Sequence, residues 1–184
     1  MLWAQLERQE ITRAQLFESR FRLFFEQADI TGINPDAFNR HYAQGLARGF
    51  NLIEGAISVL EALQPYFQLA VITNGIAEIQ KSRLAGAGLK RYFSHIIISE
   101  EIGCEKPAAR FFEQALLHCG VVNHEQVLVV GDSLTADIAG GIEFGLDTCW
   151  YNPQKASAPE HLKPTYVIDN LYTLLSLLKI PVHL

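Results

Sequence analysis

The 184-residue chain is 49% hydrophobic and 19% charged, which is typical of one compact domain with a small appendage and excludes disordered and fibrous proteins. Its 15 basic and 20 acidic residues give a net charge of -5, and no lysine or arginine run suggests a nucleic acid polymer or a membrane as partner. No apolar stretch approaches the roughly 20 residues that cross a bilayer. We therefore expect a cytoplasmic protein. The cysteines, Cys104, Cys119 and Cys149, have no CxxC spacing and fit reduced thiols that pack as small hydrophobic side chains.

The first part of the chain is predicted to be helical. Apolar residues recur at helical spacing within residues 1–49, with almost no β-branched run. Thr12 and Gln15 have the form of a capping box that opens one helix, and Asn34 before a proline opens another. Glycines then interrupt the helical pattern, so we expect a helical segment over 1–49 and a second domain over 50–184.

The second part alternates short apolar, β-branched runs with segments of helical spacing. The runs predict strands at 69–73, 96–98, 127–130, 148–151 and 166–168. The helical spacing predicts helices at 77–84, 108–118 and 135–144. This alternation predicts an α/β fold, in which helices cover both faces of a doubly wound parallel sheet. Ligands bind beyond the carboxyl ends of the strands in such sheets, so a site is expected there.

The first candidate residues follow the run at 69–73. Thr73-Asn74-Gly75 offers a hydroxyl, an amide and a glycine that lets backbone N–H groups turn toward an anion. An Asn-Gly turn that merely closes a strand is the alternative.

Two carboxylates follow the run at 127–130. Asp132 lies at the predicted strand end and Asp137 in the first turn of the next helix, so both can face one point. Two hard oxygen donors with room for waters and a phosphate suit an octahedral Mg²⁺ ion. Alternatively, Asp132 or Ser133 caps the helix and Asp137 complements the helix dipole.

Lys106 is the candidate cation. Pro107 suits the first position of the following helix, which would place Lys106 at the positive end of that helix. A cation is unfavourable there unless an anion lies nearby, so this placement favours a phosphate neighbour. The alternative is a solvated surface lysine.

Taken in chain order, VITNG at a strand end, EKP before a helix, and VLVVGDSLTADIAGG resemble the haloacid dehalogenase-like (HAD) superfamily of phosphohydrolases. The match includes the second, third and fourth signature motifs, with Thr73, Lys106, and Asp132 with Asp137 in the family's order. The resemblance implies a Rossmann-like core with an N-terminal helical cap, here residues 1–49. VITNGIAEIQKSRLAGAGL, IISEEIG and GLDTCWYNP look most like the pyrimidine 5'-nucleotidase branch, which removes phosphate from nucleoside monophosphates.

The resemblance also implies a mechanism, in which a phosphoryl group moves to an aspartate and water then hydrolyses the acyl phosphate. Thr73 and the backbone of Asn74 would hold phosphoryl oxygens, Lys106 would neutralise them, and Asp132 and Asp137 would hold Mg²⁺. Family members begin with an apolar strand that ends in Asp-x-Asp, and the first aspartate attacks phosphorus.

This sequence contains no Asp-x-Asp and opens directly in the cap. We therefore expect the chain as written to be an inactive fragment of such a phosphatase. The resemblance places the absent strand between the strands that end at Thr73 and Asp132, so the sheet should be interrupted there.

Two alternatives remain open. A nucleophile-free binding or interaction protein could keep the phosphate and metal pocket. Within the enzymes, HAD phosphatases for sugar phosphates or flavin nucleotides share the core motifs and differ in the cap. A true dehalogenase is less expected, because its chemistry does not need the Mg²⁺ pair. The sequence determines neither the exact small-molecule phosphate monoester nor the oligomeric state.

Overall fold

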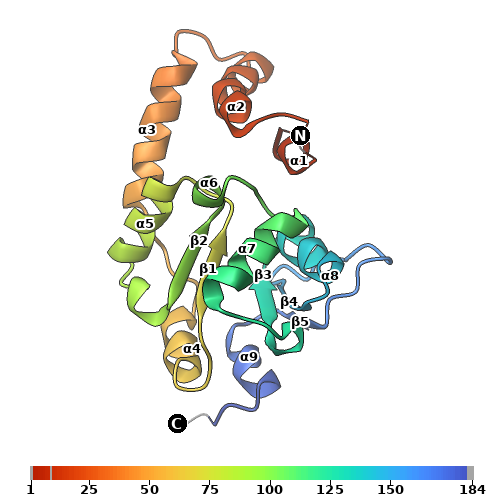
Figure 1. Ribbon diagram of the computed structural model, residues 1–184. Coiled ribbons are helices and arrows are strands. Elements are labelled where there is room, and N and C mark those ends of the chain that lie inside the picture. Colours follow the sequence, from red (N-terminus) through yellow and green to blue (C-terminus); the bar gives the residue numbers. More distant parts are fainter. Residues whose placement is uncertain (1, 9, 182–184) are drawn as a thin grey trace.

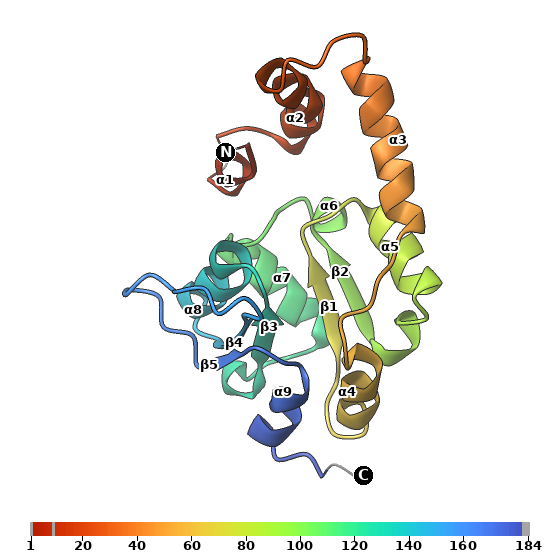
Figure 2. The same cartoon turned by 180° about the vertical axis from the view of Figure 1, so that it is seen from behind.

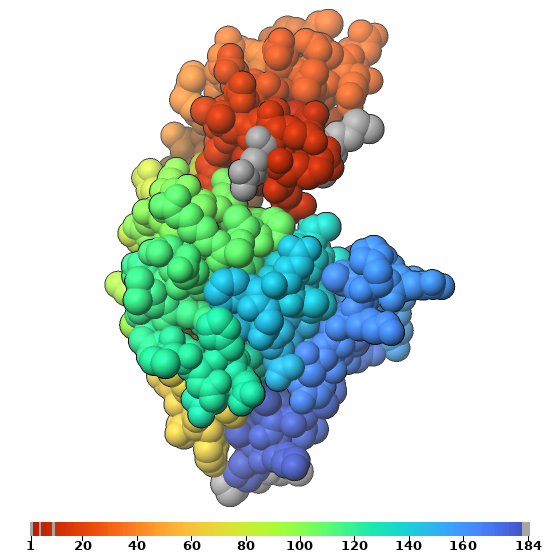
Figure 3. Space-filling view, turned by 45° about the vertical axis from the view of Figure 1, so that its right-hand side comes forward, coloured from red at the N-terminus to blue at the C-terminus, as the bar shows by residue number. Residues whose placement is uncertain are grey.

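The computed structural model describes residues 2–8 and 10–181, and it has two parts (Figures 1 and 2). A helical segment consists of α1 (Leu2–Glu7), α2 (Arg13–Gln27) and α3 (Pro35–Arg48). The rest of the chain forms an α/β part, on which the helical segment is seated (Figure 3). No helix in the described ranges is both long and apolar enough to span a membrane.

Both predicted helix starts are confirmed. The N–H of Thr12 donates to Oε1 of Gln15 at 2.8 Å and the N–H of Gln15 donates to Oγ1 of Thr12 at 3.3 Å, which completes the capping box of α2. Asn34 caps α3, because its Oδ1 accepts from the N–H of Ala37 at 2.9 Å. The two helices then pack through edge-to-face contacts between aromatic rings.

All five predicted strands are present, each within one or two residues of its expected bounds. They are β1 (Ala70–Thr73), β2 (His95–Ile98), β3 (Leu128–Gly131), β4 (Asp147–Tyr151) and β5 (Tyr166–Ile168). The helices of this part are α4 (Ala56–Leu63), α5 (Ala77–Gly86), α6 (Ser99–Ile102), α7 (Ala109–Cys119), α8 (Gly140–Glu143) and α9 (Tyr172–Leu177). Short 3-10 turns lie at Lys90–Tyr92 and His124–Gln126.

The strands form two parallel sheets, which confirms the α/β class. One sheet has the order β1-β2 and the other has the order β3-β4-β5. Within the described residues β1 and β3 are therefore edge strands that do not pair with each other. The interruption that we expected between the strands ending near Thr73 and Asp132 lies between these two edges.

Helix α7 joins the two sheets through two adjacent phenylalanines. Phe111 packs with Ile97 of β2, and Phe112 packs with Val129 of β3, while Ile72 of β1 contacts both groups. Phe111 and Phe112 are 0% and 1% exposed. Burial of a side chain of this size contributes about 1.5 to 3 kcal/mol, so both phenylalanines help to hold α7 against the two sheets.

The predicted helix at 135–144 is wrong in its geometry. Leu134–Ala139 is a π-helix, η3, and the α-helical turn α8 follows it. The π-helix begins after Ser133, whose Oγ accepts from the N–H of Ala136 at 3.1 Å. Single π-helical turns are rare and often lie at functional sites.

The predicted helical start at Pro107 is also wrong. Helix α7 begins at Ala109 with Ala108 as its N-cap residue, and the Lys106–Pro107 peptide bond is cis. The reason is tertiary, because the Asn74 side chain holds the backbone of Lys106 through both its N–H and its carbonyl. The segment before α7 is therefore bound to the loop after β1.

The thiols are expected to be unreactive in the folded protein. Cys149 is fully buried in β4, and burial raises the pKa of its thiol to about 11. Burial also raises the pKa of Cys104 and Cys119. Because the folded-state pKa of Cys149 exceeds the ordinary value of 9.0, its contribution to stability should be complete below that pH and lost as the pH rises toward 11.

Iodoacetamide labelling at neutral pH, read by peptide mass spectrometry, tests this. Cys149 should label only after denaturation, and labelling in the native chain at the rate of the denatured chain would contradict the assignment.

Candidate active site

The candidate site lies at the carboxyl ends of β1 and β3. Thr73 ends β1, and Asn74 follows it. Lys106 comes from the segment before α7, Asp132 directly follows β3, and Asp137 lies in η3. Figures 1 and 2 show that the carboxyl ends of β1 and β2 point toward the helical segment. Parallel strands thus bring three separated sequence motifs to one edge of the α/β part.

Lys106 and Asp137 form a buried ion pair, with 2.6 Å between Nζ and Oδ1. Only 6% of Lys106 and 7% of Asp137 are exposed. Lys106 Nζ also donates to the carbonyl of Ile72 at 2.9 Å. Lys106 is therefore not a solvated surface lysine. The anion beside it is the Asp137 carboxylate, whereas the sequence favoured a phosphate, and the phosphate neighbour stays a prediction.

The side chain of Asn74 holds Lys106 in place. Its Oδ1 accepts from the N–H of Lys106 at 2.9 Å, and its Nδ2 donates to the carbonyl of Lys106 at 2.7 Å. A planar amide bound at two points fixes the backbone of its partner in one orientation. Sequence reasoning proposed that the amide and backbone of Asn74 face a bound anion, and it missed this contact with Lys106, which no local pattern in the sequence encodes.

Asp137 is fixed on its second oxygen as well. Its Oδ2 accepts from the N–H of Ser133 at 3.1 Å. A side chain at Gly131 would collide with it, since a Cβ there would lie 2.3 Å from Oδ2. The helix-capping role that we considered as an alternative belongs to Ser133, and Asp132 does not cap the helix.

The carboxylate of Asp132 and the hydroxyl of Thr73 point to the second feature of the site, its free oxygen atoms. Asp132 is exposed, and within the described residues neither its carboxylate nor the Thr73 hydroxyl takes part in a side-chain hydrogen bond. The backbone of Asp132 is fixed, because its carbonyl accepts from Nε1 of Trp150 at 3.1 Å. These oxygens are therefore available to bind an ion or a ligand.

The donor set fits a Mg²⁺ ion that keeps most of its waters. Asp132 offers a free carboxylate, and Asp137 uses two of about four acceptor positions. Within residues 2–8 and 10–181, no cluster of three or more His, Cys, Asp or Glu residues could hold a metal ion unaided. Mg²⁺ is usually held by one or two carboxylates together with water and phosphate oxygens, which is the set that this site could supply.

An arginine from the helical segment reaches the same edge, and sequence reasoning missed it. Arg13 donates from Nε to Oε1 of Glu105 at 2.9 Å and from an η nitrogen to the carbonyl of Gly75 at 2.6 Å. Arg13 is the first residue of α2, where the helix dipole disfavours a cation. The positive charge of Arg13 at this unfavourable position was the signal that could have indicated a nearby carboxylate.

The thiol of Cys104 lies two positions before Lys106 in the sequence. Burial is the main cause of the rise in the pKa of Cys104, which the positive charge of Arg110 partly offsets and the negative charge of Glu105 supports. The thiol therefore stays protonated at neutral pH and is a poor nucleophile.

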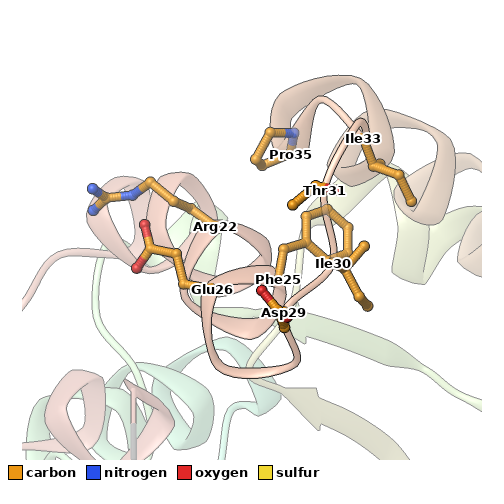
Figure 4. A pocket seen from close by; sticks show the side chains of 8 residues that line it. All are labelled: Arg22, Phe25, Glu26, Asp29, Ile30, Thr31, Ile33 and Pro35. Carbon is orange, nitrogen blue, oxygen red and sulfur yellow. The ribbon is translucent and has the colours of Figure 1, made fainter.

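A concave surface in the helical segment lies away from these residues. A pocket of about 280 Å³ is formed at the carboxyl end of α2 and the connection to α3 (Figure 4). Its wall includes the apolar side chains of Phe25 and Ile30, with Arg22, Glu26 and Asp29 among its polar groups. None of the candidate site residues lines this pocket, so it is not part of the site described above.

Comparison with known proteins assigns the family. A model of the haloacid dehalogenase-like hydrolases matches residues 5–151, most of the chain. The chain belongs to the haloacid dehalogenase-like hydrolase family. This confirms the resemblance carried by the motifs around Thr73, Lys106 and Asp132.

The HAD relatives include nucleotidases. The chain is 36% identical to pyrimidine 5'-nucleotidase YjjG of Escherichia coli, over 96% of this chain and 77% of that protein. It is also 36% identical to pyrimidine 5'-nucleotidase PynA of Streptococcus pneumoniae, over 96% of this chain and 75% of that protein. The HAD-hydrolase YfnB of Bacillus subtilis has a similar structure, with a TM-score of 0.89 at 35% identity, over 97% of this chain and 78% of YfnB. That crystal structure is described as bound to magnesium and as revealing interdomain movement.

Proposed function

We propose that the chain carries the phosphate- and Mg²⁺-binding groups of a HAD phosphatase that acts on nucleoside 5'-monophosphates. The observation that supports this most is the buried Lys106–Asp137 pair, which Asn74 holds beside the free oxygens of Thr73 and Asp132. The nucleotide preference rests on the two pyrimidine 5'-nucleotidase relatives.

Each residue has a distinct task in this proposal. The Thr73 hydroxyl and the N–H of Asn74 donate to phosphoryl oxygens. An ammonium group has three N–H donors, and Lys106 uses two of them on Asp137 and Ile72, which leaves one for a phosphoryl oxygen. Lys106 would thereby offset the negative charge that gathers on the phosphoryl group, while Asp137 keeps the ammonium aimed at it.

The charges of the site favour a divalent cation. Lys106 is balanced by Asp137, and Arg13 is balanced by Glu105, so Asp132 leaves these groups with a net negative charge. A phosphate dianion would be repelled by that arrangement. Bound at Asp132 and Asp137, Mg²⁺ would reverse the sign of the local charge and polarise the phosphoryl group.

Residues 1–49 form the cap in this proposal, and residues 50–184 form the core. Helix α3 ends at Arg48, one residue before the boundary. The cap would choose the leaving group, and its aromatic side chains could stack on a base, although packing between α2 and α3 already accounts for those rings.

The chain as written should not turn over phosphate esters. Attack on phosphorus requires a carboxylate from an Asp-x-Asp strand, and the sequence contains no such motif. The retained groups only bind and neutralise charge. We expect no hydrolysis of p-nitrophenyl phosphate by the purified 184-residue chain in the presence of Mg²⁺. Turnover that persists through repurification and disappears in Asp132→Ala would show that another group supplies the nucleophile.

The second candidate is a binding protein that retains the phosphate and metal pocket formed around Lys106 and Asp137. The coding DNA upstream of Met1 distinguishes the two. An in-frame apolar strand that ends in Asp-x-Asp supports the phosphatase, and a stop codon directly upstream supports the binding protein. A substrate panel on the upstream-extended protein, with nucleoside monophosphates, sugar phosphates and a flavin nucleotide, would then decide between the enzyme alternatives.

A further inference from the structure

Arg13 binds three separate core segments through one guanidinium group. It donates to the Gly75 carbonyl after β1, to the Ser99 hydroxyl at the start of α6 and to the Glu105 carboxylate before α7. The Nη–Oε1 distance to Glu105 is 2.6 Å, and the two side chains are only 18% and 20% exposed. Ser99 is 1% exposed. The guanidinium therefore lies in a built, mostly solvent-excluded position.

These contacts close a ring with the candidate site. Gly75 is bonded covalently to Asn74, and Glu105 is bonded to Lys106. The Asn74 side chain links Asn74 to Lys106, since it binds the N–H and the carbonyl of Lys106. Arg13, which belongs to the helical segment, then connects the carbonyl of Gly75 to the carboxylate of Glu105. Every path around this ring passes through a residue beside the proposed phosphate site.

We infer that Arg13 is a positioning residue, which holds the Asn74–Lys106 clamp in its phosphate-binding geometry when α2 is docked on the core. The inference rests on the proposed function, because it assigns the clamp to phosphate binding. Arg13 does not touch the phosphate in this account. It acts on Lys106 through Glu105 and on Asn74 through Gly75.

The chemistry of the Arg13 side chain supports a positioning role and not merely the attachment of α2 to the core. An arginine presents donors in a rigid planar fork, so it can fix several acceptors relative to one another. A lysine would satisfy the charge of Glu105, but its compact ammonium lacks the planar fork that reaches Glu105, the Gly75 carbonyl and the Ser99 hydroxyl in fixed directions. Because coupling between two sites is reciprocal, phosphate bound at the clamp should also favour docking of α2.

The test compares Arg13→Gln and Arg13→Lys with the matched control Arg8→Gln in the full 184-residue chain. Arg8 pairs with Glu10 in an exposed contact that does not involve the core. Two measurements are made on each ¹⁵N-labelled protein. The first is amide hydrogen exchange at Lys106, read against Cys149 of β4. The second is binding of inorganic phosphate with saturating Mg²⁺, by calorimetry.

Arg13→Gln should speed exchange at the Lys106 N–H by at least about fivefold, the lower end of typical coupling between sites, and weaken phosphate binding by a similar factor. Exchange at Cys149 should not change. Arg13→Lys should give an intermediate result, and Arg8→Gln should match the unmodified chain. A purely structural role would instead accelerate exchange at Lys106 and Cys149 together, and that outcome would overturn the inference.

The two hypotheses fail in different ways. If the unmodified chain binds no phosphate with Mg²⁺, the proposed function is wrong, while the exchange data still decide whether Arg13 orders the clamp. If the unmodified chain binds phosphate and Arg13→Gln binds it equally well, the inference is wrong and the proposed function stands. Should Arg13→Gln fail to fold, Ser99→Ala and Arg13→Lys remove only part of the contact, and unchanged exchange at Lys106 in both would refute the inference.

Discussion

An Asp132→Asn substitution is expected to lower kcat by orders of magnitude in a form of the protein extended upstream by a strand that ends in Asp-x-Asp. The Asp132 carboxylate is exposed, and Trp150 fixes its backbone, so it is available as a direct ligand of Mg²⁺. An amide oxygen carries no net charge and binds this hard cation more weakly. A metal ion stabilises the charge of the transition state by several kcal/mol, which corresponds to a loss of this size.

Lys106→Ala should be severely impaired as well, because the ammonium that offsets the phosphoryl charge is removed.

The measurement is steady-state hydrolysis of a nucleoside monophosphate over a range of Mg²⁺ concentrations. Asp147→Asn is the matched control, because Asp147 is exposed at the amino end of β4, whereas the candidate site lies at the carboxyl ends of the strands. It should retain nearly full activity. If Asp132→Asn remained close to fully active at saturating Mg²⁺, Asp132 would not be a metal ligand.

Removal of the Asp137 side chain should strongly destabilise the fold. In Asp137→Ala the ammonium of Lys106 stays in a buried position with no anion beside it. Breaking a buried ion pair in this way costs about 3 to 5 kcal/mol, a large part of the 5 to 15 kcal/mol that is typical for a whole domain. Asp137→Ala combined with Lys106→Met should lose less stability than Asp137→Ala alone, because no buried charge is left unpaired.

Urea denaturation followed by circular dichroism gives the free energies of unfolding. Glu101→Ala provides the control, since Glu101 pairs with Lys81 in an exposed contact whose side chains are 42% and 56% exposed. That variant should change stability by less than about 1 kcal/mol. Equal losses in Asp137→Ala and Glu101→Ala would mean that the Lys106–Asp137 pair is not buried in solution.

Local patterns in the sequence determined the elements and their order. Strands such as β2 and β4 follow from short β-branched runs, and the starts of α2 and α3 follow from caps that act within three or four residues. The strand ends then identified where Thr73 and Asp132 lie, because parallel strands direct their carboxyl ends to one edge. The family comparison confirms the superfamily that these motifs indicated.

Contacts between distant segments decided the rest. Lys106 is buried against Asp137 because Asn74, 32 positions away, holds its backbone, and no helix end is involved. Arg13 meets Glu105 across 92 positions, and α7 bridges the two sheets with side chains that a sequence pattern shows only as apolar. Periodicity and capping report interactions within a few residues of the chain. The charge partners of a buried lysine or arginine depend on which loops the fold brings together, and only the tertiary structure determines that.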